Sequence, residues 1–63
     1  MPDKFVIRHI RELQWVSRFG SEYTPNLSDA RQYPSFKAAD EDAVVGSEVV
    51  QAIDAAERDA ANG

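Results

Sequence analysis

Apolar residues in the first third of the chain fall into two short segments, 4–10 and 13–19, which are rich in β-branched and aromatic side chains. Such side chains suit the pleated, half-buried surface of a strand. In the second segment the alternation places Trp15 and Val16 on opposite faces. We therefore expect the two segments to pair as an antiparallel hairpin, with the turn near residues 9–12.

A single helix over residues 4–19 is the alternative interpretation of this region. Pro2 and Gly20 would suit its first and last positions. On a helical wheel, however, the apolar positions spread over most of the circumference, whereas an amphipathic helix gathers them in one stripe. The pattern thus favours the hairpin.

The middle of the chain carries turn and capping signals. Residues 24–26, Thr-Pro-Asn, predict a turn, and Asn26 suits the cap of a short helical turn over residues 27–31. Residues 30–33 could add a short third strand at the sheet edge. The edge is required because Pro34 cannot donate a ladder hydrogen bond.

From residue 35 onward, apolar residues recur at spacings of three and four, which predicts one long helix to residue 62. Ser35 suits its N-cap, and residues 40–42, Asp-Glu-Asp, would then lie near the positive end of its dipole. Gly46 interrupts the pattern at a cost of about 1 kcal/mol relative to alanine. A break into two helices at residues 46–47 is the alternative. The stripe keeps its phase across the glycine, which favours one helix bent there.

These elements predict a single α+β domain over residues 1–63. Its β-rich body, residues 4–34, is a small antiparallel hairpin or three-stranded sheet, and one long acidic C-terminal helix, residues 35–62, packs on it. We expect a single shared core made of Trp15, Phe5, Phe36 and Ile53, with Ala39 and Val50 adjoining.

Composition narrows the function classes. The chain has 63 residues, no cysteine and one histidine, which excludes disulfides, thiolate metal sites and a histidine-rich metal site. No nucleophile–base set accompanies His9, and the three glycines are isolated, so no phosphate-binding loop is present. We therefore expect that the protein is not an enzyme and that it binds neither a cofactor nor a metal ion. No apolar run could cross a bilayer and no signal peptide opens the chain, which predicts a cytoplasmic protein without a membrane span.

The net charge of −4 is distributed unevenly. Residues 1–37 hold six bases and four acids, whereas residues 38–63 hold one base and seven acids. An acidic arm joined to a mildly basic body predicts two candidate surfaces. The first would bind a basic partner through Asp40, Glu41, Asp42, Glu48, Asp54, Glu57 and Asp59. The alternative would bind nucleic acid through Lys4, Arg8, Arg11 and Arg18, with aromatic residues between them for base stacking.

The helical region is also rich in small residues, which permit close helix–helix approach. A homodimer through the C-terminal helix is therefore a further expectation. The small residues concerned are Ala39, Ala43, Ala52, Ala55, Ala56 and Ala60.

Two segments of the chain resemble a known family. They are residues 15–17, Trp-Val-Ser, and residues 23–39, which run from Tyr-Thr-Pro-Asn-Leu through Tyr-Pro-Ser-Phe to Lys-Ala-Ala. They resemble short phage and prophage proteins that have an aromatic-aliphatic-Ser strand, a Thr turn, an Asn-Leu-x-x-Ala segment and a capped helix. The resemblance covers roughly residues 4–45.

Small acidic phage proteins often inhibit host machinery, and anti-CRISPR proteins are the best-known class. The resemblance therefore implies an inhibitor that binds a host protein or protein–nucleic-acid complex, most plausibly a CRISPR effector, in the host cytoplasm. A small nucleic-acid-binding or regulatory module that uses the basic hairpin is the alternative.

Overall fold

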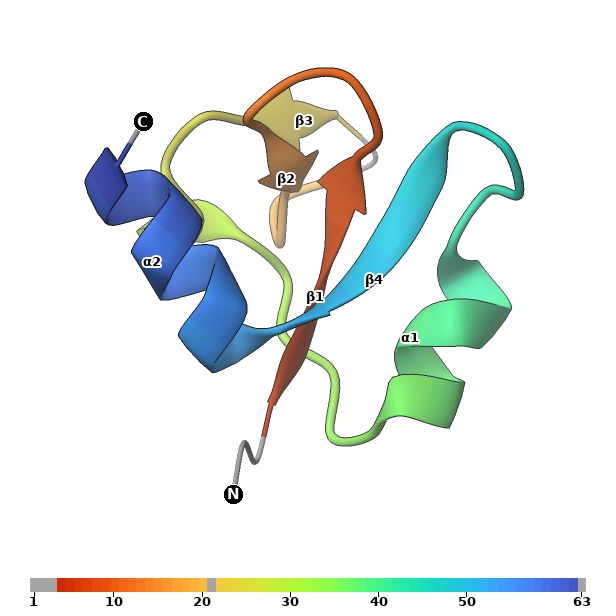
Figure 1. Cartoon of the computed structure of the whole chain (residues 1–63). Coiled ribbons are helices and arrows are strands. Elements are labelled where there is room, and N and C mark those ends of the chain that lie inside the picture. The colour runs from red at the N-terminus through yellow and green to blue at the C-terminus, as the bar shows by residue number, and fades with distance from the viewer. Residues whose placement is uncertain (1–3, 21, 63) are drawn as a thin grey trace.

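A four-stranded antiparallel sheet with the strand order β3-β2-β1-β4 forms the centre of the fold. The computed structural model describes residues 4–20 and 22–62. Figure 1 shows the two α-helices on opposite sides of this sheet. The α+β class, with an antiparallel sheet and a C-terminal helix, is thereby confirmed. The elements in chain order are β1 (Phe5–His9), β2 (Trp15–Val16), β3 (Tyr23–Thr24), the 3-10 turn η1 (Leu27–Asp29), α1 (Phe36–Asp42), β4 (Glu48–Ala52) and α2 (Ile53–Asn62).

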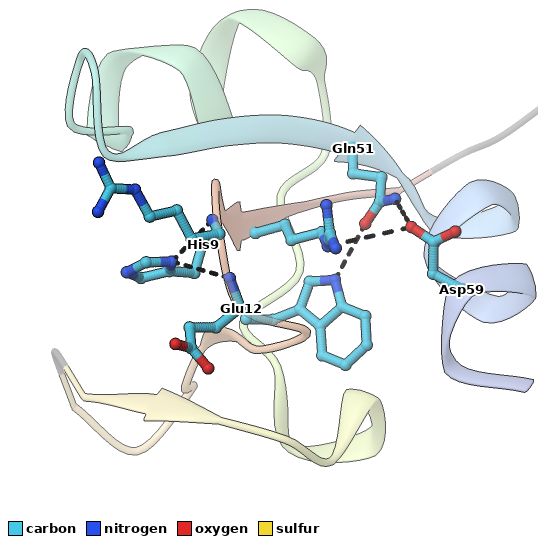
Figure 2. A network of polar contacts seen from close by, with 7 residues as sticks. His9, Glu12, Gln51 and Asp59 are labelled. Carbon is cyan, nitrogen blue, oxygen red and sulfur yellow. Dashed lines mark hydrogen bonds and ion pairs between the residues drawn. The ribbon is translucent and has the colours of Figure 1, made fainter. Parts of the chain in front are cut away.

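The expected hairpin is present, because β1 pairs antiparallel with β2 and Arg8 lies opposite Trp15. Its second strand is shorter than predicted, since β2 covers only Trp15–Val16 of residues 13–19. The connecting turn has no glycine. Instead, Nδ1 of His9 accepts hydrogen bonds from the backbone N–H groups of Arg11 and Glu12, at 3.0 and 3.1 Å. Figure 2 shows the imidazole placed over this turn. A side-chain acceptor thus stabilises a turn that lacks the usual glycine.

The central strand β1 is buried on both faces. Val6 and Ile7 are adjacent in sequence and almost fully buried, so they point to opposite sides of the sheet. A strand covered on both faces has no polar face, which is why the alternation in residues 4–10 is irregular.

Two apolar clusters therefore replace the single expected core, and that expectation is wrong. On the α2 face, Trp15 and Ile53 pack with Val6 and Ala56. On the other face lie Phe5, Ile7, Tyr33, Ala39 and Val50.

Phe36 is not part of either cluster. Its side chain is 56% exposed. Its ring meets the ring of Phe5 edge-on, with 6.1 Å between the centroids. Phe36 is the first residue of α1, so it belongs to the start of that helix and not to the core as expected.

The continuous helix expected over residues 35–62 is also wrong. The first helix ends at Asp42, and β4 pairs with β1 along its full length before α2 begins at Ile53. Gly46 has φ +89°, a left-handed conformation that no α-helix contains. Val49 and Val50 are β-branched and follow this break, so the chain continues as a strand.

The predicted helix caps and the predicted third strand are only partly confirmed. Ser35 caps α1 as expected, and its Oγ accepts a hydrogen bond from the N–H of Ala38. Asn26 occupies the N-cap of η1, but its side chain makes no capping hydrogen bond there. The third strand is β3 and not residues 30–33, whose Ala30 and Tyr33 form isolated bridges to Ser17 and Phe5.

Candidate functional site

Three of the seven acidic side chains predicted to bind a partner are already engaged in the fold. Oδ2 of Asp42 accepts the hydroxyl of Tyr33 at 2.9 Å. Glu48 accepts the backbone N–H of Val44 at 2.8 Å and the hydroxyl of Tyr23. The first bond joins the end of α1 to Tyr33, and the bond to Tyr23 joins β4 to β3. The third engaged carboxylate is that of Asp59.

Asp59 belongs to a network on the α2 face. Its Oδ2 accepts Nε2 of Gln51 at 2.6 Å, and Oε1 of Gln51 accepts Nε1 of Trp15 at 3.0 Å (Figure 2). Nε of Arg8 lies 4.0 Å from the same Asp59 oxygen, without a hydrogen bond. Arg8 and Asp59, which the sequence assigned to two opposing surfaces, therefore pair with each other.

The other four acidic residues are exposed. Asp40 and Glu41 lie on α1, and Asp54 and Glu57 lie on α2. Because α1 ends at Asp42, residues 40–42 lie in its last turn, at the negative end of the helix dipole and not at the positive end as expected. Carboxylates at that position oppose the dipole, so they do not stabilise α1.

The remaining bases of the alternative surface do not form a continuous track. Lys4 precedes β1 and Arg11 follows it, so the two exposed side chains lie at opposite ends of that strand. The Arg18 guanidinium lies over the ring of Phe19, 4.8 Å from its centroid, and this ring is 75% exposed. Trp15 is fully buried and not available for base stacking.

The loop between α1 and β4 presents two exposed apolar side chains, Val44 at 55% and Val45 at 98% exposure. The loop is nevertheless held by hydrogen bonds. The Val44 carbonyl oxygen accepts the N–H groups of Ser47 and Glu48, and the Val44 N–H donates to the Glu48 carboxylate. Val45 is thus presented to solvent by an ordered backbone.

A pocket of about 260 Å³ adjoins this loop on the α1 face of the sheet. It contains two carboxylates and one guanidinium among apolar side chains. The lining residues are Ile7, Val16, Gly20, Arg31, Tyr33, Asp42, Val44 and Glu48.

The two tyrosines that bond these carboxylates have altered acidity. Burial, followed by the hydrogen bond to Asp42, raises the pKa of Tyr33, although nearby Arg31 opposes the shift. The hydrogen bond to Glu48 is the main reason that the pKa of Tyr23 is raised. Both hydroxyls therefore remain neutral donors, and they fix the orientation of Asp42 and Glu48 at the pocket.

Helix α2 has fewer features of a protein-binding surface than the loop between α1 and β4. Its exposed side chains include Asp54, Glu57 and Arg58, and no large apolar side chain on it is exposed in the described part of the chain. Ala39 and Ala56 are completely buried, each in a cluster that also contains β1. These small residues let the helices approach the sheet closely.

The sequence pattern did not reveal the pocket or the exposed loop. Val44 and Val45 fall within residues 35–62, for which the sequence pattern predicts one long helix. Gly46 was the one signal that could have revealed the loop, because a glycine beside two valines suits a tight turn that precedes a strand.

No helix in the described part of the chain is long and apolar enough to span a membrane. Within residues 4–20 and 22–62, no group of three His, Cys, Asp or Glu side chains is arranged to hold a metal ion. Comparison with protein-family models, curated proteins and solved structures gives no match to this chain. Its function must therefore be inferred from the site.

Proposed function

We propose that this protein is a small binding module that recognises a basic surface of another protein. The surface that would do so, named here the α1–β4 surface, consists of Asp40, Glu41, Asp42, Val44 and Val45. One observation carries the proposal. An ordered loop holds Val45 98% exposed, three residues beyond the last of three carboxylates that lie at the unfavourable end of a helix.

This arrangement matches the anatomy of a protein–protein interface. Such interfaces combine a small apolar centre with a polar rim. Val44 and Val45 would form the centre, and Asp40 and Glu41 would lie at the rim. Exposed carboxylates accelerate association with a positively charged partner and fix its orientation.

The finer proposal concerns the partner class. The resemblance to short phage proteins supports a host protein or protein–nucleic-acid complex as the partner, in the bacterial cytoplasm. A CRISPR effector is the preferred candidate. Its nucleic-acid-binding surface must be basic, and an acidic protein that covers this surface would inhibit it.

A phage-plating assay tests inhibition directly. A bacterium with active CRISPR immunity would express the wild-type chain, and the plating efficiency of a targeted phage would be measured. We expect the wild type to raise plating and Val45→Asp to abolish the increase. Phe19→Asp is the matched control, because it changes another exposed apolar residue outside the α1–β4 surface.

Two other functions remain alternatives with weaker support. The exposed Arg18–Phe19 pair favours nucleic-acid binding, because a cation beside an aromatic ring suits a nucleotide. A gel-shift assay on Arg18→Glu would test that alternative. A homodimer through α2 is less favoured, because none of the exposed large apolar residues in the described part of the chain lies on that helix. Sedimentation analysis would test it.

A further inference from the structure

The pocket beside the α1–β4 loop has the chemistry of a site for one basic side chain. Its polar lining comprises the carboxylates of Asp42 and Glu48 and the guanidinium of Arg31. We propose that it receives an arginine side chain from the partner protein. The inference rests on the proposed function, because it identifies the anchor of the same surface.

The balance of charge at the pocket favours a cation. Two carboxylates and one guanidinium line the pocket, which leaves an excess of negative charge. The guanidinium of Arg31 lies near the Tyr33 hydroxyl, and its Nη2 donates to the carbonyl oxygen of Gly20 at 3.4 Å. The Tyr33 hydroxyl bonds Oδ2 of Asp42, and no hydrogen bond reaches Oδ1 in the described part of the chain. That oxygen can therefore accept a new donor, and Tyr33 already holds its carboxylate in place.

The apolar lining suits a basic side chain with a long stem. Ile7 and Val16 come from neighbouring strands, and Val44 adds an apolar group from the loop. Basic side chains bury their methylene groups against such surfaces while the charged end meets polar groups. Val44 also continues into Val45, so the pocket is contiguous with the proposed interface.

Arginine fits better than lysine because the two carboxylates come from different elements. Asp42 is the last residue of α1, and Glu48 is the first residue of β4. Both oxygens of Glu48 already accept a hydrogen bond, so this carboxylate adds mainly its negative charge. A planar guanidinium carries five donors in a fork and can donate to Oδ1 of Asp42 while it lies beside Glu48, whereas an ammonium is a compact point charge. A partner segment with an exposed arginine is therefore the expected occupant.

The test uses the wild-type protein and short peptides, so it needs no identified partner. Acetyl-Gly-Arg-Gly-amide is titrated while the methyl signals of Ile7, Val16 and Val44 are followed by NMR. Matched peptides replace arginine with citrulline, lysine or glutamate. We expect the arginine peptide to shift these signals with millimolar affinity, and the lysine peptide to bind more weakly. The neutral citrulline peptide should bind about fivefold more weakly still or not at all.

Two isosteric variants localise the binding. Asp42→Asn removes the charge but keeps an oxygen for the Tyr33 hydroxyl, and it should weaken arginine-peptide binding about fivefold. Asp54→Asn makes the same change on exposed α2 and should leave the affinity unaltered. Retained amide spectra in both variants show that the fold is intact.

The inference is overturned if the arginine peptide shifts none of these signals, or if citrulline binds equally well. It is also overturned if the glutamate peptide binds best, because Arg31 would then determine the ligand. A different result would contradict the proposed function and leave the arginine site in place. Arginine-peptide binding would persist while Val45→Asp had no effect on phage plating.

Discussion

The Trp15 indole donates a hydrogen bond from Nε1 to Oε1 of Gln51, which lies 36 positions further along the chain, at 3.0 Å. Trp15 is fully buried, so this bond satisfies the only polar atom of its side chain. Gln51 also donates to Asp59, and the same amide therefore joins the sheet to α2 (Figure 2). One side-chain amide on β4 thus holds the tryptophan and the C-terminal helix in register.

Substitution of Trp15 should reduce stability in two graded steps. Trp15→Ala should cost about 3–5 kcal/mol of unfolding free energy, because it leaves a large cavity under α2. Trp15→Phe should cost about 1–3 kcal/mol, because Oε1 of Gln51 loses its donor. Urea denaturation followed by circular dichroism measures both. The double variant Trp15→Phe/Gln51→Met should cost less than the sum of its single changes if the bond is formed.

His9 should stabilise the β1–β2 turn through its acceptor nitrogen. His9→Ala leaves the N–H groups of Arg11 and Glu12 without this partner, and we expect a loss of about 1–2 kcal/mol. His9→Asn retains a side-chain oxygen and should recover part of the loss. Urea denaturation of both variants checks this. Equal stability of wild type and His9→Ala would mean that water replaces the imidazole without cost.

The sequence predicted the hairpin because Trp15 and its neighbours carry strong β preferences that the tertiary fold did not override. It could not distinguish a long helix from a helix, loop and strand over residues 35–62. Val49, Val50 and Ile53 satisfy a helical spacing, and the pairing of β4 with β1 joins residues more than 35 positions apart. Pattern analysis within a short window does not detect such pairing.

The sequence predicts the acidic character of the candidate site but not the positions of its residues in the fold. Residues 40–42 were correctly identified as an acidic segment, yet their place at the end of α1 depends on where the helix stops. The pairing of Arg8 with Asp59 also requires α2 to lie against β1 and β4. Residue type alone carries no information about that contact.

Stability should fall in alkaline solution, and Tyr33 should account for part of the decline. Its pKa is raised in the folded state, so the folded protein holds the hydroxyl proton more tightly than the unfolded chain does. This contribution is fully present below about pH 10, the ordinary tyrosine pKa, and is lost as the pH rises through the folded value. Urea midpoints measured from neutral to strongly alkaline pH should decline less steeply for Tyr33→Phe. An identical decline in the two proteins would contradict this assignment.

Gly46 and Gly20 form a matched pair for a test of backbone strain. An added Cβ would meet nothing within 4 Å at either position, but only Gly46 of the two is in the left-handed region, with φ +89°. Gly46→Ala should therefore cost about 1–2 kcal/mol. Gly20→Ala should leave the thermal midpoint unchanged or slightly raised. Equal midpoints for the two variants would show that the loop relaxes to accept a side chain.

The central claim is that the acidic residues of α1, and not those of α2, bind the partner. Asp40→Asn/Glu41→Gln and Asp54→Asn/Glu57→Gln remove equal charge from exposed positions on the two helices. Their effects on folding should differ in sign. The α1 pair lies at the negative end of its helix dipole, whereas Asp54 lies in the first turn of α2, where a carboxylate is favourable.

The most direct measurement compares the host proteins that wild type and the two double variants capture from a bacterial lysate, quantified by mass spectrometry. We predict that Asp40→Asn/Glu41→Gln loses the proteins captured by wild type without loss of thermal stability, and that Asp54→Asn/Glu57→Gln retains them. Capture should also weaken as salt is raised, because exposed charges are screened over about 8–10 Å. Retention by the α1 variant together with loss by the α2 variant would contradict the account.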